Sequence, residues 1–393
     1  MGRGAVSWAG TLVCRKLSMK SSIVLALGCA LVAPCWADIS ALVVTEPTAR
    51  KQALMVSRSS LEASLATLSG QKATVATTED LTDAMRATRS AGPDVFIAPP
   101  QVVASALAHG YQLLGSTEGE DQYVLVGAAR VASAAGMRQG RLYLPQQDSI
   151  FTYLARGMLT ANGLSFKDLR QVEHARYPQA GLTSIALQQS DATVTLRSDW
   201  EAWNLANPGL AKVLATSGPV PGGLSVAVKK DLPADLRDKL GRWFATSAPT
   251  CGLKTVALRT DLAVYQRVAE LGAFTPTSLP GAAVVTAADV KRLQAQGAVL
   301  VDTRNDKEFQ HRHIPGALHV PYVEKSLKDV AYEARLDDFA GLARLDKSAA
   351  TIFHCNGAEC WKSYKASRAA LAAGFAKVYW FRGGMPEWEK TAL

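Results

Sequence analysis

Short apolar runs alternate with stretches of helical periodicity between residues 41 and 246. We expect strands where the run is brief and β-branched, and helices where apolar residues recur every three or four positions. The predicted strands are Ala41–Val44, Val95–Ala98, Tyr123–Val126, Arg141–Leu144, Ala192–Leu196 and Leu224–Val228. The predicted helices are Leu81–Thr88, Gln101–His109, Ile150–Ala161, Gly181–Gln189 and Pro233–Ala245. This alternation favours α/β architecture with parallel sheets.

A second, smaller α/β unit is predicted after a break in this pattern. Residues 276–283 are rich in Pro, Gly and small residues, which is typical of a linker. Beyond them, Thr286 is expected to cap a helix that reaches Gln296, and Val299–Asp302 indicates a buried strand. We therefore predict one domain over residues 38–275, a linker over 276–283 and a second domain over 284–393.

The first 37 residues have the pattern of an export signal. Lys20 precedes an apolar run, Ile23–Ala33, which is too short to span a bilayer of about 30 Å as a helix. Small residues then stand where a signal peptidase cleaves, so we expect cleavage after Ala37 and a periplasmic product. Cys29 offers a lipoprotein site as the less favoured alternative. Translation from either Met1 or Met19 fits the pattern.

Charge and cysteine content narrow the function further. The formal charge is +9, and removal of the four basic residues of the signal leaves +5. No stripe of Lys and Arg interleaved with aromatic residues follows, which argues against nucleic-acid binding, and no later apolar run is long enough for a membrane span. The histidines show no metal-ligand spacing, so neither a metal nor a cofactor is expected. Cleavage leaves Cys251, Cys355 and Cys360, too few for a disulfide framework.

Cys355 is the strongest candidate for chemistry. The apolar run Thr351–Phe353 indicates a strand, a short Gly-containing loop begins at the cysteine, and a helical pattern runs from Ser363 to Ala373. Such a junction directs backbone N–H groups and a helix N-terminus toward the thiol, which stabilises a thiolate or a bound anion. Lys362 and Lys365 would add positive charge.

Four ordered motifs over residues 284–393 resemble the rhodanese (sulfurtransferase) family. They are Leu300–Arg304, Phe309–Ala317 with its His-Ile-Pro-Gly-Ala ending, the Cys355 loop, and Val378–Trp388 with its Gly-Gly pair. The resemblance implies that the loop cysteine takes sulfur from a donor such as thiosulfate, becomes a persulfide and passes the sulfur to a thiol or cyanide. It assigns catalysis to Cys355, loop roles to Asn356, Gly357, Ala358, Glu359, Cys360, Trp361 and Lys362, and supporting roles to Asp302, Arg304 and His313.

The loop departs from the commoner sulfurtransferase pattern. A basic residue often stands five positions after the cysteine and a serine six after it, whereas Cys360 and Trp361 stand there in this chain. Trp361 also excludes the phosphatase chemistry of related folds, which needs an arginine to clamp phosphate. The second cysteine followed by Trp resembles a subgroup of exported rhodanese-like proteins associated with quinoprotein-dependent catabolism. Cys360 is then a resolving or disulfide-forming thiol, or a small residue packed at the helix start.

Several phrases before residue 246 resemble the phosphonate/phosphite class of ABC-transporter periplasmic binding proteins. They are Pro93–Pro100, Arg141–Ser149 and Pro221–Leu224. The resemblance implies two α/β lobes around a cleft that holds a small oxyanion at helix N-termini, and a transporter partner. The candidate ligand residues are Gln146, Gln147, Ser149 and Thr152. Helix capping is the alternative role for Ser149 and its neighbour Asp148.

These observations predict an exported sulfurtransferase. Its nucleophile is Cys355, its partners are a small sulfur donor and a thiol acceptor, and its N-terminal domain binds a small solute. Two alternatives stay open: a dithiol redox protein that uses Cys355 and Cys360, and a non-catalytic solute-binding or sensing protein. A transporter or a quinoprotein-related protein is the expected partner.

Overall fold

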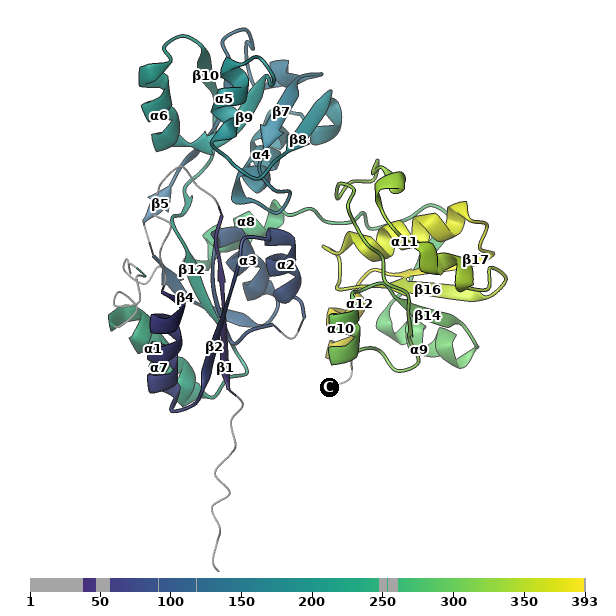
Figure 1. The fold of residues 1–393 in the computed structure, drawn as a ribbon. Helices are drawn as coiled ribbons and strands as arrows, with labels where there is room; N and C mark the ends of the chain where they lie inside the picture. Colours follow the sequence, from purple (N-terminus) through teal and green to yellow (C-terminus); the bar gives the residue numbers. More distant parts are fainter. Residues whose placement is uncertain are drawn as a thin grey trace, which may run out of the picture. The chain divides into compact units, whose positions relative to one another are not determined.

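The computed structural model describes residues 38–46, 57–90, 92–117, 119–246, 253 and 261–391 (Figure 1). The predicted signal peptide, its cleavage site and Cys251 lie outside these residues. Within them, no helix is both long enough and apolar enough to cross a membrane.

The first lobe of the N-terminal domain is built on a five-stranded sheet in the order β2-β1-β3-β12-β4. Its strands are β1 (Ile39–Val44), β2 (Ala73–Thr78), β3 (Val95–Ala98), β4 (Tyr111–Ser116) and β12 (Ser225–Lys229). Its helices are α1 (Arg58–Ser69), α2 (Leu81–Ala87), α3 (Pro100–Ala108), α7 (Ala234–Thr246) and α8 (Leu262–Glu270). Apolar residues on both faces of this sheet are buried, so the lobe has two layers of core.

The second lobe has its own sheet in the order β10-β6-β9-β7-β8. Its strands are β6 (Tyr123–Ala128), β7 (Arg141–Leu144), β8 (Gln171–His174), β9 (Ala192–Leu196) and β10 (Ala211–Thr216). Its helices are α4 (Ile150–Ala161), α5 (Ala180–Ala186) and α6 (Arg197–Ala206), with 3-10 turns η1 (Ala135–Met137) and η2 (Phe166–Asp168). A two-stranded ribbon, β5 (Glu120–Asp121) with β11 (Val220–Pro221), lies where the chain enters and leaves this lobe.

The α/β architecture is confirmed, but the sheets of both lobes are mixed: β1 pairs parallel with β2 and β3, and β7 pairs parallel with β8 and β9. Strand β12 pairs antiparallel with β3 and β4, and β6 pairs antiparallel with β9 and β10. The chain leaves the first lobe after β4 and returns to it only at β12, so β12 enters that sheet from the second lobe. Local periodicity predicts that a segment is a strand, but its direction depends on this long-range path.

The C-terminal domain has an all-parallel sheet in the order β13-β17-β16-β14-β15. Its strands are β13 (Ala282–Val284), β14 (Val299–Asp302), β15 (Leu318–His319), β16 (Ala350–His354) and β17 (Lys377–Phe381). Its helices are α9 (Ala287–Ala295), α10 (Asp306–His311), α11 (Trp361–Ala372) and α12 (Gly384–Lys390), with turns η4 (Ala334–Leu336) and η5 (Ala340–Arg344). Strand β13 begins within the stretch of linker composition.

Alternating side chains of the central strand β16 serve the two halves of this core. Ile352 packs with the cluster that includes Met385, and Phe353 packs with the cluster that includes Ala366 of α11. The expected cap at Thr286 is confirmed, because its hydroxyl accepts from the Asp289 N–H and the Asp289 carboxylate accepts from the Thr286 N–H, which forms a capping box. Strands β14 and β16 pair in parallel, so their carboxyl ends lie side by side.

Candidate active site

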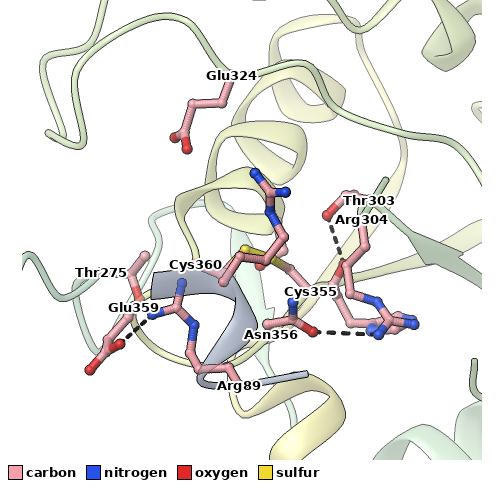
Figure 2. The surroundings of a disulfide bond; sticks show 12 residues. Arg89, Thr275, Thr303, Arg304, Glu324, Cys355, Asn356, Glu359 and Cys360 are labelled. Carbon is pink, nitrogen blue, oxygen red and sulfur yellow. Dashed lines mark hydrogen bonds and ion pairs between the residues drawn. A yellow bond between two sulfur atoms is a disulfide. The ribbon is translucent and has the colours of Figure 1, made fainter. Parts of the chain in front are cut away.

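Cys355 is the first residue after β16 and heads the loop that leads into α11 (Figure 2). Its side chain is buried and forms a disulfide with Cys360, with 6.2 Å between the two Cα atoms. Cys360 is the N-cap residue of α11, so the helix begins at Trp361, two residues before the predicted start. The apolar run thus ends at a cysteine whose partner sits at the N-terminus of a twelve-residue helix.

The carbonyl groups of the loop are held by neighbouring segments. The Cys355 carbonyl accepts from the Met385 N–H at 2.9 Å. The Ala358 carbonyl accepts from both the N–H and the hydroxyl of Thr275, at 2.8 and 2.7 Å. Gly384 lies so close to the loop that a Cβ there would overlap the Cys355 carbonyl. These contacts fix the direction of the peptide planes on the cysteine side of the loop.

The amide groups of the same loop are left available. In the described part of the chain, no acceptor is recorded for the N–H groups of Gly357, Ala358 and Glu359. Gly357 has φ +85°, a left-handed conformation that helps consecutive N–H groups to converge. Together with the N-terminus of α11, these donors can stabilise a thiolate, a persulfide or a bound anion.

Asp302 ends β14 and Arg304 follows it by two residues, and the two side chains form a buried ion pair beside the loop. The Arg304 guanidinium donates to both carboxylate oxygens of Asp302, at 2.6 to 3.1 Å, and to Asn356 Oδ1 at 3.4 Å. Burial acts to raise the pKa of Asp302, but the charges of His354 and Arg304 outweigh it and hold that pKa below its usual range. Asn356 also donates to Glu308 at 2.5 Å, so the residue after the cysteine is fixed on two sides.

His354 is a buried residue beside the site that the sequence did not single out. Burial lowers the pKa of its imidazole to about 4, so the ring is neutral at ordinary pH. Asp302 Oδ2 lies 3.6 Å from its Nε2, because residues 302 and 354 face each other in the register of β14 and β16.

His313, by contrast, has no recorded contact with the cysteine loop. Its Nδ1 lies 2.9 Å from the Phe309 carbonyl, and its ring stacks on that of Phe309 at the end of α10. These contacts are local to α10 and the turn that follows it.

Of the two lysines expected to add charge, only Lys362 faces the site. It lines the crevice beside Cys360, and burial together with the charge of Arg86 lowers the pKa of its ammonium group. Lys365 is fully buried and points elsewhere, to Glu324 at 2.6 Å and Ser326 Oγ at 2.8 Å. A buried, paired ammonium of this kind holds a loop rather than a ligand.

The crevice beside the disulfide also contains residues that the sequence gave no reason to place there. Arg86 lies in α2 of the first lobe, Arg89 lies in the turn just after that helix, and Thr275 precedes the predicted linker. The lining residues are Thr82, Arg86, Arg89, Arg304, Glu308, Glu324, Lys328, Asn356, Glu359, Cys360, Trp361 and Lys362. Apart from the charge of the arginines, no signal in the sequence could have found this set, because the contacts join segments about 270 residues apart.

The four candidate ligand residues of the N-terminal domain lie around the start of α4 and all have partners within the protein. Gln146 accepts from the Leu81 N–H and donates to the Glu79 carbonyl. The remaining contacts are Gln147 with the Lys328 N–H at 2.8 Å, Ser149 with the Phe151 N–H at 3.2 Å, and Thr152 with the Gln146 carbonyl at 2.9 Å. Ser149 thus caps α4, the alternative role weighed for it.

A carboxyl group of the protein occupies the N-terminus of α4. Glu46 accepts from the Ile150 N–H at 3.1 Å and from the Ser149 hydroxyl at 2.8 Å. Burial raises the pKa of this carboxyl to about 7, although the hydrogen bonds act in the other direction. Among the described residues, no group of His, Cys, Asp and Glu could hold a metal ion.

The fold thus consists of two α/β lobes with mixed sheets, followed by a small parallel α/β domain with a cysteine at the end of its central strand. The family model described as "ABC transporter, phosphonate, periplasmic substrate-binding protein" matches residues 43–279, and the one described as "Rhodanese-like domain" matches residues 286–391. The chain therefore belongs to the phosphonate-type periplasmic substrate-binding proteins and carries a C-terminal rhodanese-like domain.

Similar proteins are known for both parts. The thiosulfate sulfurtransferase GlpE of Pseudomonas savastanoi is 32% identical over 100 residues, which are 25% of this chain and 79% of that protein. The thiosulfate:glutathione sulfurtransferase of Saccharomyces cerevisiae is 26% identical over 107 residues, 25% of this chain and 73% of that one. A binding protein component of an ABC phosphonate transporter from Pseudomonas aeruginosa has 13% identity and a TM-score of 0.39, over 53% of this chain and 74% of its own.

Proposed function

We propose that the chain is an exported sulfurtransferase in which Cys355 carries sulfur as a persulfide. The observation that carries this proposal is the loop after β16, where a cysteine meets three amides with no recorded acceptor and the N-terminus of α11. Such donors favour the negatively charged forms of sulfur over the neutral ones. The similarity to thiosulfate sulfurtransferases supports the same reading.

The reaction begins from the reduced site. An external dithiol first reduces the Cys355–Cys360 disulfide to two thiols and is itself oxidised to a disulfide. The Cys355 thiolate then attacks the outer sulfur of thiosulfate, the S–S bond of the donor breaks, and sulfite leaves with the bonding electrons. An acceptor thiolate attacks the outer sulfur of the resulting persulfide, which returns Cys355 to its thiolate.

Mass spectrometry of the intact full-length protein tests this proposal. The Cys360→Ser variant is used so that the persulfide accumulates, and it is treated with thiosulfate after reduction. We expect a gain of one sulfur atom on Cys355 and release of an equal amount of sulfite. Cys355→Ser should gain nothing. A reduced Cys360→Ser protein that gains no sulfur from thiosulfate or from organic thiosulfonates would refute the proposal.

A dithiol redox function is the second candidate, and the disulfide favours it. Here the Cys360 thiolate attacks Cys355 Sγ of the persulfide, the outer S–S bond breaks, and sulfide leaves while the two cysteines become oxidised. The wild type would then release sulfide and re-form its disulfide, whereas Cys360→Ser would not. If sulfur transfer to an acceptor thiol is as fast in Cys360→Ser as in the wild type, the redox pair is not needed for transfer.

The N-terminal domain is proposed to bind a small oxyanion, as its family suggests. Gln146, Gln147, Ser149 and Thr152 stay the candidate ligands, and a ligand would have to replace their present partners. Calorimetry on the full chain with phosphonate, phosphite and sulfate measures this directly, and no heat with any of them would count against the assignment. N-terminal sequencing after expression in a Gram-negative cell tests cleavage after Ala37, while a transporter or quinoprotein-related partner stays a prediction.

A further inference from the structure

The turn that follows helix α2 of the binding-protein domain contacts the cysteine loop of the rhodanese-like domain. Arg89 forms an ion pair with Glu359, the residue before Cys360, and both side chains are almost wholly buried, at 6% and 13% exposed (Figure 2). The Ser105 hydroxyl of α3 donates to the same carboxylate at 3.4 Å. The first lobe therefore forms part of the wall around the second cysteine.

The crevice at this contact is lined by more positive than negative groups. Five of its residues are cationic, namely Arg86, Arg89, Arg304, Lys328 and Lys362, and three are acidic, namely Glu308, Glu324 and Glu359. One of the cations, Arg86, lies in α2 and another, Arg89, lies just after it, and Cys360 is among the lining residues. Three of these cations are paired with acids outside that set: Arg86 with Asp83, Arg304 with Asp302 and Lys328 with Asp148. Among the described residues no partner is recorded for the Lys362 ammonium, so a small anion that enters the crevice would meet this charge next to the disulfide.

Donor groups in this crevice are also left unused. Arg89 Nε is buried and has no hydrogen-bond partner in the described structure. No ion pair or hydrogen bond of the Lys362 side chain is recorded there either, and the pKa of its ammonium is lowered by burial and by Arg86. The Arg86 guanidinium pairs with the partly exposed Asp83 at 2.6 Å, while its Nε lies 3.8 Å from Glu308, too far for a hydrogen bond. Buried donors without acceptors are costly, and a bound anion would satisfy them.

We propose that α2 and the turn after it complete the sulfur-donor site, with Arg86, Arg89 and Lys362 holding an anionic sulfane donor beside the Cys355–Cys360 loop. The two domains then share one site, and its preference is for a small donor with two negative charges. This inference rests on the proposed sulfurtransferase function for its substrate, but it assigns new residues and a role for the binding-protein domain. Arg86 and Arg89 act as positioning residues, because they hold the donor and take no part in bond exchange.

Two matched donors test the charge preference in the full-length Cys360→Ser protein. Thiosulfate carries two negative charges and methanethiosulfonate carries one, and both leave a sulfur atom on the cysteine when sulfite or methanesulfinate departs. Arg86→Gln should lower the rate constant for thiosulfate about tenfold more than that for methanethiosulfonate, since a charge-assisted contact is lost. Arg86→Lys should restore part of the ratio. Arg138→Gln, which removes an exposed arginine paired with Asp168, is the control of equal charge.

Binding without turnover gives an independent measurement. In the full-length Cys355→Ser/Cys360→Ser protein, the fluorescence of Trp361 in the crevice reports thiosulfate binding. The Kd should rise about tenfold with Arg86→Gln, and also with the paired change Arg89→Gln/Glu359→Gln, which leaves no buried charge unpaired. The Arg138→Gln control should not move it.

The outcomes separate the two proposals. If sulfur reaches Cys355 but both arginine variants match the control in donor ratio and Kd, the shared site is wrong and the sulfurtransferase stands. If thiosulfate binds through Arg86 but Cys355 never gains sulfur, the sulfurtransferase is wrong and the shared anion site stands. A parallel fall with both donors would also overturn the inference, because it would show that the arginines only support the fold.

Discussion

Replacing Gly384 by alanine should displace the cysteine loop. Gly384 has φ +53°, and an added Cβ would lie 2.8 Å from both the Cys355 carbonyl carbon and the Gly357 nitrogen, and closer still to the Cys355 oxygen. Ordinary contact begins at 3.4 Å, so the loop has to move by more than half an ångström. These neighbours are backbone atoms, which cannot turn aside as a side chain can.

Two costs follow from this geometry, and a second glycine separates them. The left-handed backbone conformation costs an alanine roughly 1 kcal/mol at either position. Gly374 has φ +84° but no atom within 4 Å of an added Cβ, so Gly374→Ala carries only that first cost. Gly384→Ala adds the collision with the loop, and a displacement approaching 1 Å at a reacting group can slow a reaction by about a hundredfold.

The assay is the rate of persulfide formation from thiosulfate in the reduced Cys360→Ser background, together with the denaturant midpoint of each variant. We expect Gly374→Ala to lose stability and keep its rate, and Gly384→Ala to lose both. Equal rates for the two alanine variants would refute the reasoning, because the loop would then tolerate the collision without moving Cys355.

Three further changes probe the parts of the structure around the two sites. The raised pKa of Glu46, about 7 against 4.5, means that the stability its neutral form contributes is present below pH 4.5 and is lost as pH rises through 7. The stability of Glu46→Gln relative to the wild type should therefore increase by roughly 2–3 kcal/mol as pH rises from 5 to 8, measured by thermal melts. A stability difference that does not change with pH would contradict this. Arg304→Lys loses the two-pronged hydrogen bonding to Asp302 and should lower the free energy of unfolding in urea by roughly 2 kcal/mol. An unchanged denaturation midpoint would contradict a stabilising role for this ion pair. Thr275→Val removes one of two hydrogen bonds to the Ala358 carbonyl and should lower the free energy of unfolding by about 1 kcal/mol in the same urea experiment. Thr275→Ser keeps the hydroxyl and should keep the wild-type value.

Much of the secondary structure followed from local pattern alone. Strands β3, β7 and β9 and helix α4 have the bounds that periodicity predicts, and Thr286 is the N-cap expected at the start of its helix. These features depend on neighbouring residues, so a single sequence carries the information. The parallel pairing expected in the two lobes holds for β1 with β2 and β3 and fails for β12, because this antiparallel strand joins the sheet only after the chain has passed through the second lobe.

Some features of the candidate site were likewise predictable from local sequence, and others were not. The sequence by itself determined that Cys355 ends a buried strand and heads a loop into a helix, since apolar runs, a glycine and helical spacing are local signals. It left the state of Cys360 open, and the structure joins it to Cys355 because the short loop brings the two Cα atoms within disulfide distance.

Only the tertiary structure decided which charges surround that cysteine pair. Lys365 follows the loop in sequence but turns away to Glu324, whereas Arg89 stands far earlier in the chain and meets Glu359. Side-chain direction on a packed helix and contact between distant segments depend on how the sheets and domains fill space. The thiol was therefore evident from the sequence, and its electrostatic surroundings were not.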